Sequence, residues 1–308
     1  MRYNVLAALK TGEGDVSGES LARRLGISRV AVWKHVRELR SLGYVVTSSP
    51  RGYRLESSPD LLLPSEFTGW ETRVHYEAVA DSTMHVARAL ARRGADEGTL
   101  VIAERQTAGR GRLDRSWLSP EGGIYMTLVA RPTAVPSQAP RINLLVAVVV
   151  SETIERLYGV AARVKWPNDV LIEDRKVCGI LAEMEAECDA VRFVNVGIGL
   201  NANCPIADAQ PSAVSLVEVL GTPVDRVRLV REIVGGVLSR LPQLASESIL
   251  DEWRMRTVTI GREVSIAAPG AKVSGVAVGI NSSGALLVRD SAGYVHEVVA
   301  GDCVHESR

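Results

Sequence analysis

The first forty residues of the chain carry apolar positions at helical spacing. Residues 1–9 are apolar-periodic, and residues 20–25 form a short amphipathic segment that ends at Gly26, a residue type that commonly closes helices. Ser28 is of the type preferred as an N-cap, so we expect a longer helix to begin there. This third helix is predicted to bury one apolar stripe, made of Val32, Trp33, Val36 and Leu39.

The segment YVVTSSPRGYRL, residues 44–55, follows as two strand-like runs around a Ser-Pro-Arg-Gly turn. Helix, tight glycine turn, capped helix and hairpin together are typical of a winged helix-turn-helix, whose second motif helix enters the major groove of DNA. A small helical domain with a solvated basic face is the plainer alternative.

Strands dominate the middle of the chain, and helices fall in separate blocks. The helical patterns cover residues 82–94, 141–158 and 225–254. Between Ile172 and Val177 the run Glu-Asp-Arg-Lys predicts a hairpin turn. This segregation favours an α+β fold over a doubly wound parallel sheet.

The pattern changes again near residue 256. From Arg256 to Val304, short alternating runs separated by glycine turns predict a small all-β domain that closes as a barrel. Residues 57–64, SSPDLLLP, contain two prolines and are typical of a linker. We therefore expect three domains, at residues 1–60, 65–255 and 256–308.

Composition narrows the class of protein. The chain has 308 residues, 46% hydrophobic content and zero net charge, which excludes wholesale disorder. Its four cysteines form no CxxC pair and its five histidines do not cluster, so neither a disulfide framework nor a structural zinc site is expected. The N-terminus lacks a signal-peptide core, and the apolar run 144–150 is far shorter than the ~18 residues of a membrane span. We expect a cytoplasmic protein with no membrane partner.

Charge is unevenly distributed along the chain. Residues 1–56 contain ten Lys or Arg and five Asp or Glu, so they carry +5 and the remainder carries −5. A basic segment favours an anionic partner, and operator DNA is the partner expected here. Phosphate contacts are expected from three basic side chains, and base contacts from side chains early in the third helix. The expected DNA-binding residues are Ser28, Arg29, Lys34, His35, Arg37 and Arg51.

Several stretches of the central region carry groups suited to an anionic ligand. QTAGRGRLDRSW, residues 106–117, combines flexible glycines with arginines, whose forked donors suit carboxylate and phosphate. KWPND, residues 165–169, projects a lysine, an amide and a carboxylate from a segment stiffened by proline. RKVCG, residues 175–179, places a lysine before a glycine, and GIGLNAN, residues 197–203, carries strand glycines that indicate a close backbone approach.

Each stretch alone could be a solvated loop, a turn or a packing device. Neither glycine pattern is a dinucleotide fingerprint or a Walker P-loop, so dinucleotide oxidoreduction and P-loop ATP hydrolysis are poor fits.

Taken together, these stretches resemble the biotin protein ligase family. DST at 81–83, QTAGRGR followed by Arg and Trp, KWPND, RKVCGIL and GIGLNAN occur in the order and spacing of that family. The N-terminal winged helix resembles its bifunctional type, which also represses the biotin operon. The resemblance covers essentially the whole chain and includes the run GVAVGINSSGALLV, residues 275–288, of a C-terminal SH3-like barrel. It implies a central mixed α/β domain of the biotin/lipoate ligase type.

The resemblance also implies a reaction. Biotin's carboxylate attacks the α-phosphate of ATP to give biotinyl-5′-AMP and pyrophosphate, and a lysine of the biotin carboxyl carrier protein of acetyl-CoA carboxylase then displaces AMP. The residues that it implies as catalytic are Lys176, Arg110, Arg112 and Lys165. Those implied to bind biotin are Ser82, Thr83, Gln106, Arg110, Gly111, Arg112, Lys176, Gly179, Gly197 and Gly199. Those implied to bind ATP or the adenylate are Arg112, Arg115, Trp117, Lys165, Asn168, Asp169, Asn201 and Asn203.

Mg²⁺ is implied as well, held through the ATP phosphates with Asp169 as a candidate protein ligand. The adenylate is implied to act as corepressor and to promote a homodimer on operator DNA. For Trp117, a position in the apolar core is the alternative to a wall of the ligand site.

The sequence departs from the family pattern at three places. Met84 follows DST where asparagine is common, so a polar contact near biotin is absent or replaced. The segment CPIADAQPSAVSL, residues 204–216, has no aromatic side chain to fold over adenine, and GDCV, residues 301–304, varies the usual Gly-Glu-Val. These departures put ligand-driven ordering of the 204–216 segment in doubt.

Three other functions stay open at this stage. They are a lipoate-type ligase, a biotin-sensing repressor without ligase activity, and a ligase whose winged helix no longer binds an operator. The winged helix and the complete GRGR loop disfavour the first, and the retained lysines and arginines disfavour the second.

Overall fold

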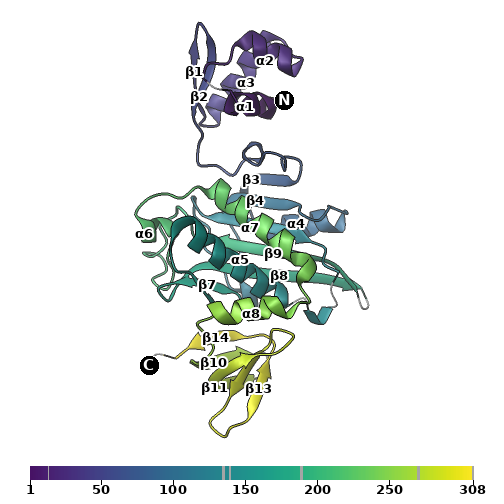
Figure 1. The fold of residues 1–308 in the computed structure, drawn as a ribbon, viewed down its shortest axis with the longest axis vertical. Coiled ribbons are helices and arrows are strands. Elements are labelled where there is room, and N and C mark those ends of the chain that lie inside the picture. The colour runs from purple at the N-terminus through teal and green to yellow at the C-terminus, as the bar shows by residue number, and fades with distance from the viewer. Residues whose placement is uncertain (13, 134–135, 139, 188–189, 269–270, 307–308) are drawn as a thin grey trace. The chain divides into compact units, whose positions relative to one another are not determined.

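The computed structural model of the chain describes residues 1–12, 14–133, 136–138, 140–187, 190–268 and 271–306. The chain divides into two compact units, Met1–Thr72 and Arg73–Arg308, each with helices and strands as expected for an α+β fold (Figure 1). No helix in the described part of the chain is both long and apolar enough to cross a bilayer. Cys178, Cys204 and Cys303 are buried and free, and Cys188 lies outside the described residues.

The first unit consists of three helices and a hairpin. Its elements are α1 (Arg2–Lys10), α2 (Gly18–Leu25), α3 (Arg29–Ser41), β1 (Val45–Ser49), β2 (Gly52–Ser57) and the short η1 (Pro64–Glu66). Gly26 ends α2 in the left-handed conformation at φ 65°. Ser28 Oγ accepts a hydrogen bond of 3.1 Å from Ala31 N and caps α3. The predicted helix-turn-helix and its antiparallel wing, β1–β2, are confirmed.

The expected buried stripe of α3 is wrong at Trp33. Val32, Val36 and Leu39 are fully buried, but Trp33 keeps 49% of its surface exposed. Successive helical residues point about 100° apart, so Trp33 lies well away from the face that Val32 turns to the core. Its ring packs instead against the guanidinium of Arg37, with 5.2 Å between Arg37 Cζ and the ring centroid.

The predicted linker contributes buried side chains. Leu62 and Leu63 are buried, as is Phe67 just beyond the linker. In η1, Glu66 accepts a hydrogen bond of 2.5 Å from Tyr44 Oη and forms an ion pair with Lys10. These contacts attach η1 to the helical part of the first unit.

The second unit is built on a seven-stranded mixed sheet with the order β3-β4-β5-β9-β8-β7-β6. Its strands are β3 (Val74–Ala80), β4 (Leu100–Gln106), β5 (Ile124–Ala130), β6 (Arg163–Lys165), β7 (Asp169–Ile172), β8 (Arg175–Glu187) and β9 (Ala190–Leu200). Strands β3 and β4 pair in parallel, and the other neighbours pair antiparallel. The predicted hairpin between Ile172 and Val177 is confirmed, with Glu173 and Asp174 at positive φ in its turn.

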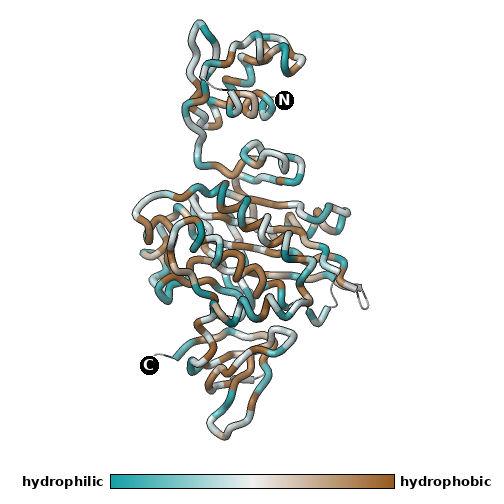
Figure 2. The backbone as a smooth tube through the Cα atoms, viewed as in Figure 1, coloured by the Kyte–Doolittle hydropathy of each residue, from teal (hydrophilic) through white to brown (hydrophobic). Residues whose placement is uncertain are grey.

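Helices cover this sheet. They are α4 (Thr83–Arg92), α5 (Arg141–Tyr158), α6 (Leu216–Leu220), α7 (Arg226–Arg240) and α8 (Glu247–Arg256), with short turns η2 (Arg112–Asp114), η3 (Pro136–Gln138) and η4 (Leu241–Gln243). Figure 1 shows α5, α7 and α8 together over one face of the sheet. Helix α5 is buried over most of its circumference, as predicted, and its apolar run stands out in Figure 2. Helix α4 packs Ala87 and Ala91 against Val101, Val129 and Phe193 of the sheet.

The end of the chain forms the predicted small all-β structure. Its five-stranded antiparallel sheet has the order β13-β12-β11-β10-β14. The strands are β10 (Glu263–Ala268), β11 (Ala271–Ile280), β12 (Leu286–Arg289), β13 (Val295–Val298) and β14 (Asp302–His305). Arg141 of α5, 3% exposed, donates to Ser282 O at 2.6 Å, and Trp166 Nε1 donates to Gly284 O at 3.1 Å. These two bonds attach the loop between β11 and β12 to α5 and to the residue that follows β6.

Candidate active site

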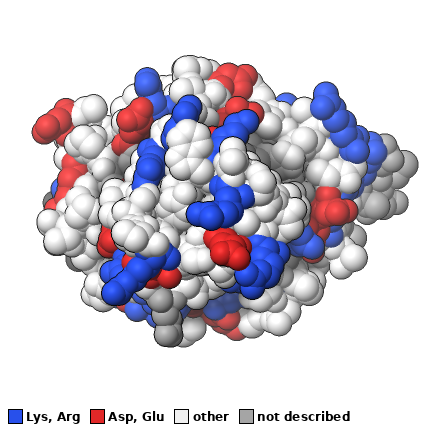
Figure 3. Space-filling view, turned by 90° about the horizontal axis from the view of Figure 1, so that it is seen from above, with Lys and Arg blue, Asp and Glu red and all other residues white. Residues whose placement is uncertain are grey.

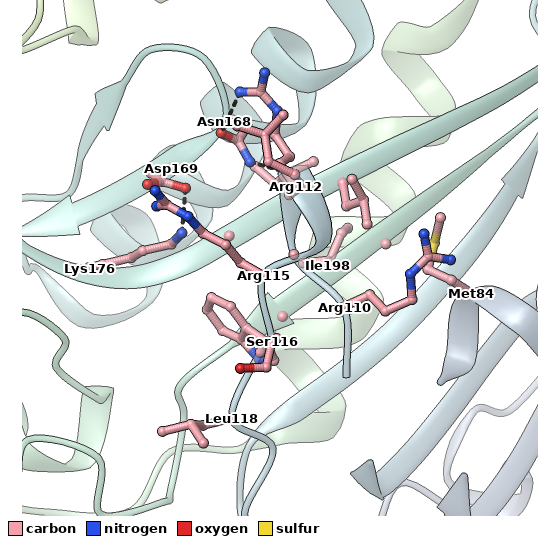
Figure 4. Close-up of a pocket in the computed structure, with 18 of the residues that line it drawn as sticks. Met84, Arg110, Arg112, Arg115, Ser116, Leu118, Asn168, Asp169, Lys176 and Ile198 are labelled. Carbon is pink, nitrogen blue, oxygen red and sulfur yellow. Dashed lines mark hydrogen bonds and ion pairs between the residues drawn. The ribbon is translucent and has the colours of Figure 1, made fainter. Parts of the chain in front are cut away.

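Segments far apart in the sequence of the second unit meet at one cavity. They are the start of α4, the loop between β4 and β5, the β6–β7 turn, the facing strands β8 and β9, and the start of β14 (Figure 4). The predicted site residues that line it are Ser82, Thr83, Gln106, Arg110, Gly111, Arg112, Arg115, Trp117, Asn168, Asp169, Lys176, Gly179, Gly197 and Gly199.

Glycines on facing strands form the floor of the cavity. Gly179 of β8 and Gly199 of β9 are directly opposite each other in the register of the sheet. A Cβ atom would lie 2.8 Å from the Trp117 ring if added at Gly179, and 2.6 Å from it at Gly199. Side chains do not fit at such distances, so Trp117 can rest on these strands only because both positions are glycine. The predicted close approach at the strand glycines is confirmed.

The arginine-rich loop between β4 and β5 folds back on itself. Trp117 N donates to Gly109 O at 2.8 Å, and Gly111 N donates to Arg115 O at 2.7 Å. A Cβ at Gly109 would lie 2.5 Å from Trp117 O, so the loop can adopt this fold only with glycine there. The residue with left-handed backbone is Leu113, at φ 53°, rather than either glycine. The loop therefore presents its arginines from a compact turn.

Polar side chains at the start of α4 hold one another in place. Gln106 Oε1 accepts a hydrogen bond of 2.9 Å from Thr83 N, and Gln106 Nε2 donates to Ser119 Oγ at 3.0 Å. Thr127 Oγ1 donates to Thr83 Oγ1 at 2.8 Å. Because each partner is fixed by another, Thr83 and Gln106 present a preorganised wall to the cavity.

Two buried polar groups next to this wall have no hydrogen-bond partner among the described residues. They are Ser82 Oγ and Trp117 Nε1, and both residues line the cavity. Buried polar groups are normally paired, so unpaired ones at a cavity indicate that a bound ligand completes their hydrogen bonding.

Met84 fills the space next to them. A Cβ at Gly197 would lie 2.9 Å from Met84 Sδ, so this side chain packs on the bare backbone of β9. Met84 is buried and lines the cavity (Figure 4). At this position the protein offers an apolar contact in place of the polar one common in the family.

Lys176 and Arg112 are held by neighbouring residues of the β6–β7 turn (Figure 4). Lys176 Nζ lies 2.7 Å from Asp169 Oδ1 and 5.2 Å from the centroid of the Trp117 ring. Arg112 Nη1 donates to Asn168 Oδ1 at 3.3 Å, and burial lowers the pKa of Arg112. A guanidinium titrates so far above neutrality that Arg112 stays charged.

Arg110 and Arg115 tie the loop to two other elements. Arg110 Nη2 lies 3.2 Å from Glu183 Oε1 of β8, and Arg110 Nη1 lies 3.3 Å from His85 Nε2 of α4. Arg115 Nη1 donates to Asp302 Oδ1 of β14 at 3.1 Å. An anionic ligand therefore has to compete with carboxylates of the protein for these cations.

Lys165 is not part of the cavity lining. It lies on β6, close enough to Cys303 and His305 to act on both electrostatically. Burial, with Lys165 as the next cause, lowers the pKa of His305 to about 4, so this imidazole is neutral at pH 7. The structure thus brings Lys176 into the cavity and leaves Lys165 outside it, and the predicted role of Lys165 stays a prediction.

Asn201 and Asn203 also lie outside this lining. Asn201 Nδ2 donates to Val214 O at 3.2 Å. The side chain of Asn203 bonds both backbone groups of Val224, at 2.8 and 2.9 Å. These amides organise the chain that follows β9, and their predicted contacts with ATP stay predictions.

The contribution of the C-terminal sheet is absent from the sequence-based prediction. Gly301, Asp302 and Cys303 line the cavity, although Asp302 is 187 positions away from its partner Arg115. Glu183, the partner of Arg110, ends the family motif RKVCGILAE, but it was not predicted as a site residue. Both are acidic residues in strands, and only the folded chain distinguishes them from solvated carboxylates.

The metal-binding capacity of the cavity is limited. The described residues include no cluster of three or more His, Cys, Asp or Glu side chains that could hold a metal ion. Asp169 and Asp302 both line the cavity. One or two carboxylates together with substrate phosphates are the usual ligands of Mg²⁺, so these residues fit an ion that arrives bound to a nucleotide.

In the first unit, the predicted DNA-binding residues divide into exposed cations and structural groups. Arg29, Lys34, Arg37 and Arg51 are exposed. Ser28 caps α3, and His35 Nδ1 lies 3.1 Å from Glu38 Oε2 on the same helix. Figure 3 shows lysines and arginines interspersed with acidic side chains on one face of the molecule.

Comparison with known proteins finds matches in both units of the chain. Residues 76–203 match the Biotin/lipoate A/B protein ligase family, residues 2–54 match the HTH domain, and residues 259–306 match the Biotin protein ligase C terminal domain. The chain is 38% identical over 299 residues to the bifunctional ligase/repressor BirA of Bacillus spizizenii, with 92% of each chain covered. It is 33% identical over 296 residues to BirA of Escherichia coli, with 92% of this chain and 91% of that protein covered.

A solved structure shares the fold of the second unit. The biotin protein ligase from Aquifex aeolicus in complex with biotin and ATP superposes with a TM-score of 0.65 and 28% sequence identity. It covers 76% of this chain and 99% of its own.

Proposed function

This chain belongs to the family of bifunctional biotin protein ligases and repressors, and we propose on that premise that it joins biotin to a carrier protein through biotinyl-5′-AMP. The observation that carries the proposal is the single cavity in which Arg110, Arg112 and Lys176 surround a glycine floor. The enzyme is an ATP-dependent, AMP-forming ligase, and its N-terminal unit makes it a transcriptional repressor as well.

In the first step an oxygen of biotin's carboxylate attacks the α-phosphorus of ATP, and the bond to pyrophosphate breaks. Unit charges ~4 Å apart repel by about 4 kcal/mol at an effective dielectric constant near 20, so the carboxylate cannot approach the phosphates unaided. Lys176 and Arg112 are placed to offset this repulsion, because their partners Asp169 and Asn168 are adjacent in the chain. Fixed cations at this point stabilise the charge that develops on the α-phosphate.

We assign Mg²⁺ to the phosphates of ATP, with Asp169 as the candidate protein ligand and Asp302 as a second carboxylate at the cavity. When bound, the ion supplies neutralising charge to the phosphate oxygens. When the substrates bind, Lys176 gives up its ion pair with Asp169 and pairs with the phosphate and the biotin carboxylate. Lys165 pairs in the sheet with Asp169, and its assistance at the phosphates stays a prediction.

The remaining wall suits the uncharged rings of biotin. Ser82 Oγ and Trp117 Nε1 are free to hydrogen-bond a ligand, since neither has a partner among the described residues. Met84 and the glycine floor offer apolar and backbone contacts. We assign Arg110 to the junction of carboxylate and phosphate, where it exchanges its ion pair with Glu183 for the ligand.

In the second step the Nζ of a lysine on the carrier protein attacks the acyl carbon of the adenylate. AMP departs with the pair of electrons of the broken carbon–oxygen bond, and the lysine loses a proton. We take the carrier to be the biotin carboxyl carrier protein of acetyl-CoA carboxylase. Until it arrives, the loop of residues 109–116 shields the reactive anhydride from water.

Arg112→Gly is expected to release about ten times more biotinyl-5′-AMP into solution than the native protein, because a hydrogen bond to a charged group contributes about 1.5–3 kcal/mol. Mass spectrometry of lysines biotinylated on an added bystander protein measures the release. Arg51→Gly, in the wing, is the matched control and should leave it unchanged. Equal retention of the adenylate by Arg112→Gly would contradict the role of Arg112 in closing the loop.

Gly199→Ala is expected to weaken biotin binding about tenfold, because the new methyl group displaces Trp117 and overpacking costs about 1–3 kcal/mol. Isothermal titration with biotin gives the affinity. Gly235→Ala in α7 is the control, since a Cβ added there meets nothing within 4 Å. If Gly199→Ala binds biotin like the native protein, Trp117 does not shape the site.

The first unit adds operator binding with biotinyl-5′-AMP as corepressor. We propose that the adenylate promotes a homodimer, since a dimer presents two α3 helices to paired half-sites. ATP and operator DNA are both cytoplasmic, which supports a cytoplasmic location.

An assay of pyrophosphate release shows whether biotin or lipoate is the substrate. With ATP and Mg²⁺ present, biotin should give release and lipoate should give none. Release with lipoate and none with biotin would replace the proposed function by a lipoate ligase.

A further inference from the structure

Two apolar side chains are exposed next to each other on α3. Val30 is 74% exposed and Trp33 is 49% exposed. Residues three apart in a helix lie on the same face, so the two form one apolar patch. The patch is separate from the core of the unit, which takes Val32, Val36 and Leu39 from the same helix.

Cations and the wing surround this patch. Val30, Trp33 and Arg29 line a groove whose other lining residues are 48–53 of the wing and 17–19 at the start of α2, with Arg51 as a second cation and Glu19 as its acidic residue. Lys34 and Arg37 are exposed on the same helix, and residues 1–56 carry a net charge of +5. The positive charge of residues 1–56 therefore favours a polyanion as the occupant over a second copy of the same basic surface.

The patch is held in a defined geometry. The Arg37 guanidinium packs on the Trp33 ring, which restricts the indole. Arg40 Nε donates to Val46 O at 2.8 Å, and its Nη2 donates to Ser48 Oγ at 2.7 Å, so the wing is fixed to α3. A rigid apolar patch beside a basic groove is a recognition surface rather than a solvated helix face.

Among the groups in the major groove of DNA, an apolar side chain can distinguish only the methyl group of thymine. We infer that Val30 and Trp33 read thymine methyl groups in the operator, while Arg29, Lys34, Arg37 and Arg51 bind phosphates. The inference rests on the proposed repressor function and names which residues set its sequence specificity. Trp33 thereby takes a role in DNA recognition that its helical spacing in the sequence did not indicate.

Uracil substitution tests the inference, because it removes the methyl group and leaves base pairing intact. The full-length protein, incubated with biotin, ATP and Mg²⁺, is first used to select its preferred duplex from random sequences. Each thymine of the selected duplex is then replaced by uracil, and binding is measured by fluorescence anisotropy. We expect at least one position at which the loss of the methyl group weakens binding about fivefold or more, the scale of one mismatched base pair.

Variants connect that loss to the patch. In Trp33→Ala or Val30→Ala the same uracil replacement should cause no further loss, since the group that reads the methyl is gone. Arg29→Ala should weaken binding to the selected and to unrelated duplexes alike. Met255→Ala, an exposed apolar residue on α8, is the control and should keep the native uracil profile.

The outcomes separate the inference from the function on which it rests. If the native protein selects no sequence, both the repressor function and the inference fail, and ligase activity is unaffected. If it selects a sequence but tolerates uracil at every position, only the inference fails. A change in sedimentation of the free protein on Trp33→Ala, with the uracil profile unchanged, would assign the patch to self-association and overturn the inference.

Discussion

Replacing Lys176 by alanine should lower the rate of adenylate synthesis about 100-fold or more, the usual effect of deleting a preorganised charge. Lys176 Nζ belongs to the cavity lining, 5.2 Å from the centroid of the Trp117 ring, and its ion pair with Asp169 holds it there. With the lysine gone, Asp169 would remain as an unpaired carboxylate that repels ATP. Single-turnover measurement of biotinyl-5′-AMP, with saturating ATP and biotin, gives the rate.

The controls for this prediction separate charge from folding. Lys272→Ala removes an exposed lysine of β11 and should leave the rate at the native value. Thermal unfolding should show that the Lys176 variant stays folded. A rate within a few-fold of the native protein would remove Lys176 from the mechanism.

Arg226→Ala should reduce the free energy of unfolding of the second unit by about 3–5 kcal/mol, the cost of breaking a buried ion pair. Arg226 is 2% exposed at the start of α7. Its Nη1 lies 2.9 Å from Glu104 Oε2 on β4 and donates to Gly123 O at 2.7 Å. Removing it leaves the buried Glu104 without this cation and breaks the contacts that tie the start of α7 to β4 and to the residue before β5.

Urea unfolding followed by tryptophan fluorescence measures this loss. Arg228→Ala, an exposed arginine on the same helix, should change stability by no more than about 0.5 kcal/mol. Arg226→Ala combined with Glu104→Ala should recover part of the loss, because no buried charge is then left uncompensated. A loss below about 1 kcal/mol for Arg226→Ala alone would show that the pair contributes little.

Local rules account for the parts of the fold that the sequence predicted well. A helix cap such as Ser28 and a left-handed glycine such as Gly26 depend on only a few neighbouring residues. Their positions can therefore be predicted from the local sequence. The strand glycines were similarly informative. Glycine weakens the interior of a strand, so Gly179 and Gly199 indicate that another group packs directly on the backbone there.

The predictions failed where the burial or the pairing of a side chain depends on residues that are distant in the sequence. Trp33 fits the helical period as well as its neighbours do, and only the small core of the first unit decides that the valines are buried. The pairing of Arg115 with Asp302 joins the loop to a strand near the other end of the chain. No local pattern carries that information.

The candidate site was predicted in its residue types more completely than in its geometry. The GRGR loop, the Asn and Asp of KWPND and the lysine of RKVCG were read from the sequence as site residues, and they line one cavity. Lys165 and Lys176 were both predicted to be catalytic, yet Lys176 lines the cavity and Lys165 does not. Lys165 ends β6 and Lys176 lies on β8, and the chain pattern alone does not tell which of the two side chains lines the cavity.

The central claim is that this cavity fuses the carboxylate of biotin to AMP and transfers the biotinyl group to a carrier lysine. Mass spectrometry of an apo carrier domain, after incubation with the protein, biotin, ATP and Mg²⁺, tests it most directly. We expect a gain of one biotinyl group on a single lysine, which requires ATP and is lost in Lys176→Ala on the same timescale. No gain with the native protein, or an equal gain with Lys176→Ala, would contradict it.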